Sequence, residues 1–322
     1  MTTKEAMEKF QNIKMTKIIE QIKATPTPIL DKFYKSAEGS VGSTIEVPIK
    51  KSDAFILKAI SKEADSSLIE SNDTYILQLK IPRFALRDMI FASDLNELKS
   101  YENSTDMLEA LSKKIANIIK SHKSSYLATQ EFMAVGAMFG KVIDGSGAVL
   151  FEYKKQNEVQ FSDSKDLQSS IAEIQDSLVK ALGYLPDFEV YVSREFYNAL
   201  YAKADKEGLF DNQGRARVRE KGALEVHGVS FIPYVAQYKN EKGKATSFLS
   251  AKEGMAIPQT QGVFKLFYAR ANHVEALSKA PQRFFAASPE ELGGGKGYAI
   301  LSESNVLPVC LNPESLVKVT WA

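Results

Sequence analysis

The spacing of the hydrophobic residues predicts a helix near the start of the chain. In residues 1–24 the apolar side chains, Phe10 and Ile18 among them, recur every three or four positions, which is the pattern of an amphipathic helix. Pro26 and Pro28 then require extended backbone. Because so short a helix has too little apolar surface to be stable alone, we expect it to lie against another surface, such as a neighbouring subunit.

After residue 43 the hydrophobic period changes to two. Alternating apolar and polar residues predict two strands, 44–49 and 74–81, and a polar stretch at 61–73 separates them. A two-stranded ribbon is only marginally stable by itself in water. We therefore expect it to project from the subunit and to pack on another chain. The apolar side chains expected at this contact are Ile45, Val47, Ile76 and Leu77.

The longest helical pattern begins at Ser104 and extends to Lys141. Ser104 can cap the helix, which at ~1.5 Å per residue would be about 55 Å long and could support a whole domain. The residues on one stripe of this helix, at spacings of three and four, are Leu108, Leu111, Ile115, Ile118 or Ile119, His122, Tyr126, Thr129, Met133 and Ala137.

The remainder of the chain alternates between helices and strands, which predicts a mixed α and β unit. Helices at 166–182 and 194–204 flank a strand at 188–192, and Gly183 is placed to end the first helix. Further strands are predicted at 229–235, 263–269, 298–301, 307–311 and 316–321.

Residues that could carry out catalysis are few. His122, His227 and His273 have no partner at metal-ligand spacing, and Cys310 is the only cysteine. The glycine-rich run 293–297 lacks the hydroxyl group that a phosphate-binding loop needs after its lysine. No nucleophile elbow, zinc-protease motif or dinucleotide fingerprint occurs. The sequence therefore predicts no enzyme, no cofactor and no metal site.

Composition and charge narrow the class of protein. Hydrophobic residues make up 44% and charged residues 25% of the chain, an ordinary globular balance. The 41 basic and 40 acidic side chains leave a net charge of +1, far from the basic excess of a protein that binds nucleic acid tightly.

The start of the chain lacks the apolar core of a signal peptide, and the longest apolar run, 134–139, is far shorter than the ~20 residues of a membrane span. A single cysteine suits a reducing compartment, so we expect a soluble intracellular protein.

Three stretches of the chain carry a family resemblance. The first comprises residues 28–34, the ribbon that follows them, and residues 75–83 at its end. The second is the long helix that follows Ser104. The third is 299–319, where a strand, an apolar pair, an Asn-Pro turn and a terminal strand follow one another. In this order the sequence resembles the phage capsid protein E family, the lambda-type major capsid proteins of tailed bacteriophages. The resemblance covers nearly the whole chain in order and length, with low residue identity.

The resemblance implies an α+β fold of the Hong-Kong-ninety-seven type, shared by tailed-phage capsids and bacterial encapsulins. In that fold an N-terminal arm and an extended E-loop reach neighbouring subunits, a peripheral domain holds a long spine helix, and an axial domain points to the centre of each capsomer. The implied boundaries are 1–40 for the arm, 41–84 for the E-loop, 85–159 and 286–322 for the peripheral domain with spine helix 104–141, and 160–285 for the axial domain.

The implied function is structural. A major capsid protein assembles as hexamers and pentamers into the icosahedral shell that encloses phage double-stranded DNA. The implied partners are other copies of the chain, a portal, a scaffold and, in some members, a decoration protein, with weak and non-specific DNA contact. The implied location is the virion capsid, assembled in the host cytoplasm. A near-neutral chain fits this reading, because a strongly basic lining would hold the packaged DNA too tightly.

Two clusters of basic residues are candidate sites. Arg215, Arg217 and Arg219 occupy every second position, so they lie on one side if the chain is extended there. In the implied axial domain they are candidates for ion pairs between subunits, with solvated surface charge or DNA contact as the alternatives. Four lysines of the long helix are candidates for an inner surface facing DNA, or for a solvated helix face: Lys113, Lys114, Lys120 and Lys123.

Two other functions remain open from the sequence. An encapsulin-like nanocompartment would share the fold and would enclose a cargo protein in place of DNA. A small-molecule enzyme could be built on an α/β core at 160–270, although a compact catalytic domain needs acid–base pairs, which are missing, and needs no projecting loop.

Overall fold

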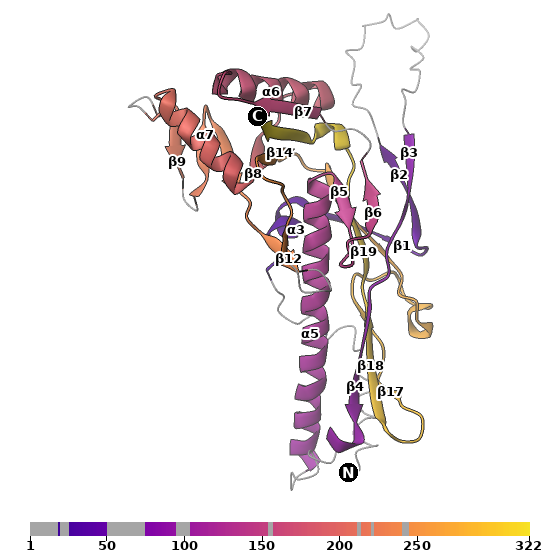
Figure 1. Ribbon diagram of the computed structural model, residues 1–322. Helices are drawn as coiled ribbons and strands as arrows, with labels where there is room; N and C mark the ends of the chain where they lie inside the picture. The colour runs from indigo at the N-terminus through magenta and orange to yellow at the C-terminus, as the bar shows by residue number, and fades with distance from the viewer. Residues whose placement is uncertain are drawn as a thin grey trace, which may run out of the picture. The chain divides into compact units, whose positions relative to one another are not determined.

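The structure is a computed structural model in which the described residues form two compact units (Figure 1). Unit 1 consists of Met1–Ile45, Lys80–Phe132 and Leu266–Pro308; unit 2 consists of Glu46–Leu79, Met133–Lys265 and Val309–Ala322. The residues that the structure describes are 19, 26–49, 75–94, 104–153, 157–210, 214–219, 222–239 and 245–322. Phe10, Ile18 and the polar stretch 61–73 lie outside them.

Unit 1 contains most of a long helix, up to Phe132, packed on an antiparallel sheet. The helix is α5 (Ser104–Met138), and the sheet joins β4 (Ala85–Phe91) to β18 (Gly297–Glu303), which also pairs with β16 (Phe285–Ala286) and β17 (Glu290–Glu291). Figure 1 shows α5 running beside β4 and β18. The core between them includes Ile90, Leu111, Ile115, Ile119 and Ile300.

Unit 1 also contains two short helices and most of a second sheet, of which the start of β15 and the end of β19 belong to unit 2. In that sheet, β15 lies between β1 and β19. The bounds are α3 (Pro28–Phe33), β1 (Ser36–Ser40), β15 (Phe264–Ala269), η2 (Val274–Ala276) and β19 (Asn305–Cys310).

The predicted long helix is confirmed, but it ends at Met138 and not at Lys141. Gly140 adopts a positive φ of 88°, and Lys141 already begins β5 (Lys141–Ile143). A Cβ on Gly136 would lie 2.6 Å from the carbonyl oxygen of Lys141, so only glycine lets the returning chain approach the helix this closely. Most of the predicted stripe is buried, whereas Ile118 and Thr129 are half-buried. The buried members are Leu111, Ile115, Ile119, His122, Tyr126, Met133 and Ala137.

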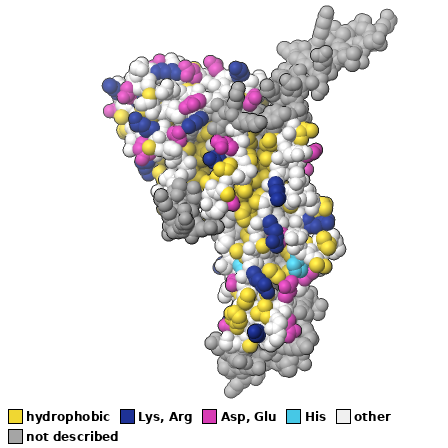
Figure 2. Space-filling view, turned by 45° about the vertical axis from the view of Figure 1, so that its right-hand side comes forward, with side chains coloured by type: hydrophobic (Ala, Val, Ile, Leu, Met, Phe, Trp, Pro, Cys, Tyr) yellow, Lys and Arg dark blue, Asp and Glu magenta, His cyan; other side chains and the backbone are white. Residues whose placement is uncertain are grey.

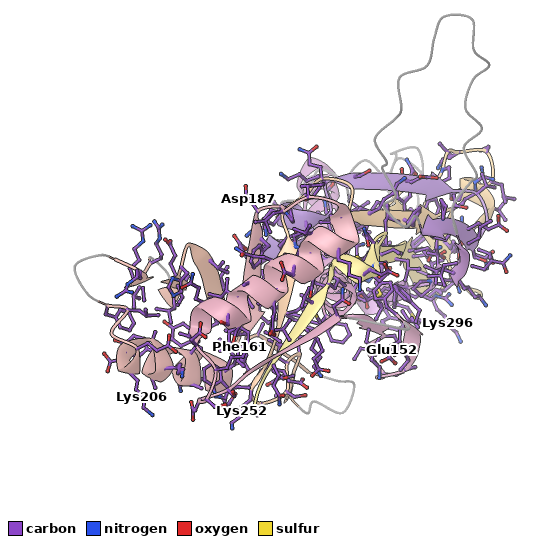
Figure 3. All side chains as sticks on the ribbon, turned by 90° about the horizontal axis from the view of Figure 1, so that it is seen from above. Glu152, Phe161, Asp187, Lys206, Lys252 and Lys296 are labelled. Carbon is purple, nitrogen blue, oxygen red and sulfur yellow. The ribbon has the colours of Figure 1, made fainter. Side chains whose placement is uncertain are left out.

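Unit 2 is built on a seven-stranded mixed sheet in the order β7-β20-β14-β8-β11-β10-β9. Two helices pack on it, α6 (Leu167–Leu182) and α7 (Arg194–Lys206), and both were predicted. Figure 3 shows Phe161 of β7, which contributes to the apolar core of this unit. The strands are β7 (Asn157–Phe161), β8 (Phe188–Val192), β9 (Ala216–Val218), β10 (Leu224–Val226), β11 (Val229–Pro233), β14 (Glu253–Pro258) and β20 (Val317–Trp321).

The ends of α6 follow the local chemistry of its sequence. The Asp166 carboxylate accepts a hydrogen bond from the backbone N–H of Ser169, and Gly183 adopts a left-handed φ of 80° at the other end. The remaining elements of unit 2 are two hairpins and a short helix: β5 with β6 (Val149–Glu152), β12 (Gln237–Lys239) with β13 (Ala245–Ser247), and η3 (Pro313–Ser315).

The two predicted ribbon strands are confirmed as β2 (Thr44–Ile49) and β3 (Tyr75–Lys80), which pair with each other. Their expected contact residues do not share one environment. Ile45 and Val47 are buried within the chain, Leu77 is half-buried, and Ile76 is exposed. Among the described helices, none is long and apolar enough to cross a membrane.

Candidate functional site

A run of buried polar residues crosses unit 1. Ser302, Glu303, Ser304 and Asn305 join β18 to β19, and each of them is at most 6% exposed. Buried polar groups are unfavourable unless they are hydrogen-bonded. The partners of these four residues therefore determine how the surrounding segments are held.

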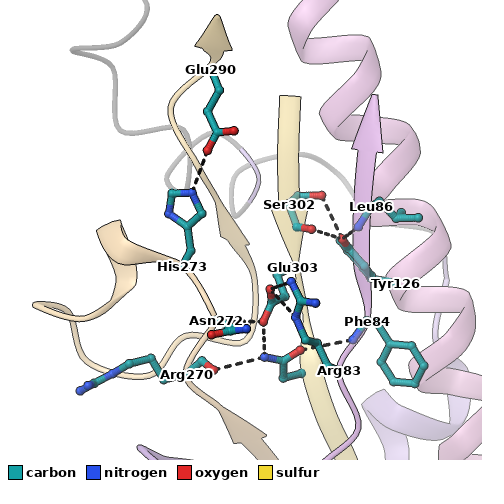
Figure 4. Close-up of polar contacts among 11 residues, drawn as sticks. Arg83, Phe84, Leu86, Tyr126, Arg270, Asn272, His273, Glu290, Ser302 and Glu303 are labelled. Atoms are coloured by element: carbon teal, nitrogen blue, oxygen red, sulfur yellow. Dashed lines mark hydrogen bonds and ion pairs between the residues drawn. The ribbon is translucent and has the colours of Figure 1, made fainter. Parts of the chain in front are cut away.

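Glu303 binds the segment that follows the ribbon. Its carboxylate accepts a hydrogen bond from Arg83 Nε at 3.0 Å and lies 3.0 Å from the Arg83 terminal nitrogen. It also accepts from the Asn272 backbone N–H at 2.8 Å and from Asn305 Nδ2 at 2.5 Å (Figure 4). One buried carboxylate thus joins the end of the ribbon to the chain that follows β15.

Tyr126 and His122 connect α5 to the same run. The Tyr126 hydroxyl donates to the Ser302 carbonyl oxygen at 2.7 Å and accepts from the Leu86 N–H at 3.1 Å (Figure 4). Burial raises the pKa of Tyr126 to about 12, so the hydroxyl keeps its proton. His122 Nδ1 lies 2.7 Å from Ser302 Oγ, and its Nε2 lies 3.4 Å from the Asp88 carboxylate. Burial lowers the pKa of His122, although Asp88 acts in the opposite direction.

A second part of the network surrounds Gln130. Its Nε2 donates to Ser304 Oγ at 2.8 Å, and its Oε1 accepts from Arg283 Nε at 2.8 Å. Burial lowers the pKa of the Arg283 guanidinium. The next residue of α5, Glu131, accepts from the N–H groups of Ile29 and Leu30 at 2.8 and 3.0 Å. Burial raises the pKa of Glu131, and these bonds hold α3 against α5.

This network is suited to holding segments in place and not to chemistry. Its side chains are engaged in hydrogen bonds with one another, and its one serine–histidine contact, Ser302 Oγ with His122 Nδ1, lies between residues that are only 2% and 5% exposed, so a substrate has no access to it. The described residues contain no group of three or more metal-binding side chains. The histidine, tyrosine and carboxylate act here as fixed donors and acceptors between elements that are distant in sequence.

The arginines predicted on one side of an extended segment lie at β9. Arg217 donates to the Glu225 carboxylate from Nε at 3.2 Å and from its terminal nitrogen at 2.8 Å, and Arg219 pairs with the same carboxylate. These bonds lower the pKa of Glu225, with Arg217 as the main cause. Arg217 and Arg219 are therefore engaged within one chain. A further role between subunits, for them and for Arg215, stays a prediction.

The four lysines of α5 do not share one face. Lys113 and Lys120 are exposed, and Lys114 pairs with Asp94 at 2.9 Å. Lys123 is only 6% exposed, and its ammonium lies 5.2 Å from the centre of the Phe284 ring. The expectation of a solvated face is therefore wrong for Lys123, because its position on the helix turns it toward the core. An inner surface facing DNA stays a prediction for the other three.

Several hydrophobic side chains of the described residues are exposed. In unit 1 they include Val41, Val274 and Leu277, and Ile76 of the ribbon is 60% exposed. Figure 2 shows hydrophobic side chains reaching the surface on one face, interspersed with lysine and arginine side chains. Grouped apolar surface is typical of protein interaction sites.

The sequence analysis missed the residues that organise the network, chiefly Arg83, Gln130 and Glu303. A signal was present, since the polar run 302–305 interrupts two apolar strands and such a run is expected to be buried with them. The identity of its distant partners Gln130 and Arg83, 174 and 220 residues away in the chain, had no local signal.

Comparisons with known proteins agree on one family. The family model for phage major capsid protein E matches residues 13–321. The major capsid protein of Salmonella phage Felix O1 is 22% identical over 240 residues, which cover 61% of this chain and 65% of that relative, just under two thirds of its length.

Solved structures agree on the fold. A prophage capsid protein of E. coli CFT073 superposes with a TM-score of 0.59 at 16% identity, covering 100% of this chain and 99% of the other. The mature capsid of bacteriophage PhiM1 gives a TM-score of 0.50 at 11% identity, covering 92% and 88%. The fold is the Hong-Kong-ninety-seven type.

Proposed function

Since the chain belongs to the phage major capsid protein E family, we propose that it is a head protein that assembles with copies of itself, as hexamers and pentamers, into an icosahedral shell around double-stranded DNA. The observation that carries the proposal is the family match, which extends over residues 13–321. The family is structural, and the polar network of unit 1 fits this role because its groups fix segments in place.

The domain roles are part of the proposal. The arm 1–40 and the E-loop 41–84 reach neighbouring subunits, and α5 is the spine helix of the peripheral domain. The axial domain is 160–285, and the peripheral domain is 85–159 with 286–322. Contacts within one chain group Val309–Ala322 with unit 2, because β20 pairs with β7 and β14 of its sheet.

The partners follow from the same proposal. The proposed partners are a portal for DNA entry and a scaffold during assembly, and family members differ in whether a separate scaffold or a decoration protein is used. The near-neutral charge of +1 supports weak, non-specific DNA contact. We propose that the protein assembles in the host cytoplasm and ends in the virion head.

The first experiment is negative-stain electron microscopy, with light scattering, of the purified protein expressed alone. Icosahedral shells, tubes, or five- and six-fold rings are the expected result. A uniform monomer or dimer at high concentration, also after addition of the phage's scaffold, would overturn the proposal. Analysis of shell contents distinguishes the alternative, because an encapsulin-like nanocompartment would contain a cargo protein and no DNA.

A further inference from the structure

An open cavity of about 640 Å³ lies within unit 1, between the residues that precede β2 and the end of β3. This volume falls in the range of roughly 300–1,000 Å³ that is usual for small-molecule sites. The residues that line it belong to three segments, 41–43, 80–83 and 269–277, together with Asn305. A ligand in the cavity would therefore touch the two ends of the ribbon and the chain that follows β15.

The charged side chains of the cavity are all positive. Lys80, Arg83 and Arg270 line it, and no carboxylate does. Lys80 is exposed and Arg270 is half-buried, and neither forms an ion pair with the described residues. The Nε of Arg270 is inaccessible to solvent, so we assign Arg270 only the effect of its charge on an anion in the cavity. An anion would bind here without displacing a carboxylate from either of these two cations.

Arg83 is held in a fixed orientation at the cavity. Its Nε and one terminal nitrogen each lie 3.0 Å from the carboxylate of Glu303, which is only 5% exposed (Figure 4). The other terminal nitrogen makes no hydrogen bond with the described residues, and the side chain is 55% exposed. A donor that is already oriented loses little conformational entropy when it binds a ligand.

Neutral groups of two kinds complete the lining. The Ser43 hydroxyl and the Asn272 side-chain amide are exposed and make no hydrogen bond with the described residues. Val41 and Leu277, which also line the cavity, are each 65% exposed. Charged and polar donors suit phosphate oxygens, and apolar side chains suit the flat face of a nucleobase. A DNA duplex, which is stiff over about 50 nm, cannot bend into a cavity of this size.

We propose that the cavity binds a nucleoside triphosphate. The phosphates lie against Lys80 and Arg83, in the positive potential to which Arg270 adds, and the base lies against Val41 and Leu277. The inference goes beyond the proposed function and does not rest on it, because one chain supplies the whole cavity. A ligand in this position ties the two ends of the ribbon to the chain that follows β15.

The test is equilibrium dialysis of the full-length protein against radiolabelled ATP without added magnesium. Binding should be saturable and should weaken as salt is raised. Unlabelled inorganic tripolyphosphate should compete, but less strongly than unlabelled ATP, because it lacks the base. Absence of saturable binding would overturn the inference. So would a DNA duplex that competes as strongly as ATP at equal phosphate concentration, because the ligand would then contact an open basic surface and not the cavity.

A charge-reversal variant locates the phosphates. Lys80→Glu should weaken ATP binding by at least about tenfold, because it removes one cation and adds repulsion. Lys80→Gln, which adds no repulsion, should give a smaller loss in the same direction. The matched control is Arg87→Glu, an exposed arginine of β4 in the same unit that does not line the cavity. It changes the net charge of the chain equally, so equal losses in the two reversal variants would contradict the inference.

A second variant locates the base. Leu277→Ser should weaken the binding of ATP and leave the competition by tripolyphosphate unchanged, because it alters only the apolar lining. The control is Val274→Ser, since Val274 is 80% exposed and does not line the cavity, and it should change neither ligand. If Leu277→Ser weakened both ligands equally, the base would not lie against this lining. Wild-type protein that forms shells but binds no ATP would refute this inference and leave the proposed function intact.

Discussion

The cores of the two units are built from different chemistry. In unit 2, Phe161 packs against Phe196, Phe231 and Trp321, with ring centres between 5.3 and 6.2 Å apart. In unit 1, the apolar face of α5 packs on β4 and β18, but the buried polar run 302–305 crosses the same region.

The difference shows two ways of specifying a core. Apolar packing is non-directional, so aromatic rings stabilise unit 2 mainly by the area that they bury. Hydrogen bonds are directional, and each lost partner leaves a buried group unsatisfied. A shift of β18 by one residue would exchange its faces and separate Ser302 from Tyr126 and His122. We infer that the polar run fixes the register of β18 in unit 1. This register positions Glu303 against Arg83, in the segment that follows β3.

The largest effect is expected in the aromatic core. Phe161→Ala should lower the free energy of unfolding by about 3–5 kcal/mol, because it removes a fully buried ring and leaves a cavity. Denaturant unfolding followed by tryptophan fluorescence is suitable, since Trp321 stacks on Phe161. Phe91→Ala is the matched control, because that ring is 49% exposed, and it should cost less than about 1 kcal/mol. Equal costs would mean that the aromatic cluster is not the core of unit 2.

A smaller but still large effect is expected for the polar run. Glu303→Ala should cost about 2–3 kcal/mol, because Asn272 N–H and Asn305 Nδ2 lose their acceptor, whereas the half-exposed Arg83 can turn to solvent. The control is Glu290→Ala, which removes the pair of Glu290 with His273. Because the Glu290 side chain is 48% exposed, this variant should lower the free energy of unfolding by less than about 1 kcal/mol. Thermal unfolding of both variants measures the difference. If Glu303→Ala cost no more than its control, the polar run would not organise unit 1.

The histidine in the run predicts a dependence on pH. Burial lowers the pKa of His122 in the folded state from its ordinary value of 6.5. Below pH 6.5 the unfolded chain therefore takes up a proton before the folded chain does, and stability should fall as the pH falls from 7 through 6.5. His122→Gln should flatten this slope, whereas His227→Asn, at a turn position with φ of 48°, should retain it. Unfolding curves at several pH values provide the measurement.

The smallest effect is expected at the surface arginines of unit 2. Glu225→Gln should cost at most about 1 kcal/mol, because Arg217 and Arg219 are about half exposed. An assembly measurement tests whether these arginines also form ion pairs between subunits. If the arginines also pair between subunits, Arg217→Glu should weaken capsomers at low salt far more than Glu225→Gln does, as seen by light scattering. Unchanged assembly of Arg217→Glu at low salt would exclude that role.

Local patterns predicted most of the elements correctly. Asp166 and Gly183 mark the ends of α6, and the stripe from Leu111 to Ala137 marks the buried face of α5, because capping and periodicity act over a few residues. The end of α5 was predicted three residues too late, because Gly136 and Gly140 read as part of a helix of small residues. The close return of the chain at Lys141 was needed to show otherwise.

The candidate contacts were less predictable, and the reason is distance along the chain. The arginines were recognised as a group from their spacing, but their shared partner Glu225 comes from the neighbouring strand β10. Lys123 is one of four similar lysines in sequence, and its contact with Phe284 separates it from the others.

The linear order of residues was enough to establish the family, the helices and strands, and the absence of motifs for catalysis, since all of these depend on local chemistry and colinearity. The folded chain was needed to reveal the Glu303 junction and the cationic cavity beside it. Hydrogen bonds and cavities depend on which distant segments meet, and the free energy of burying a polar group is set by the partners that it finds there.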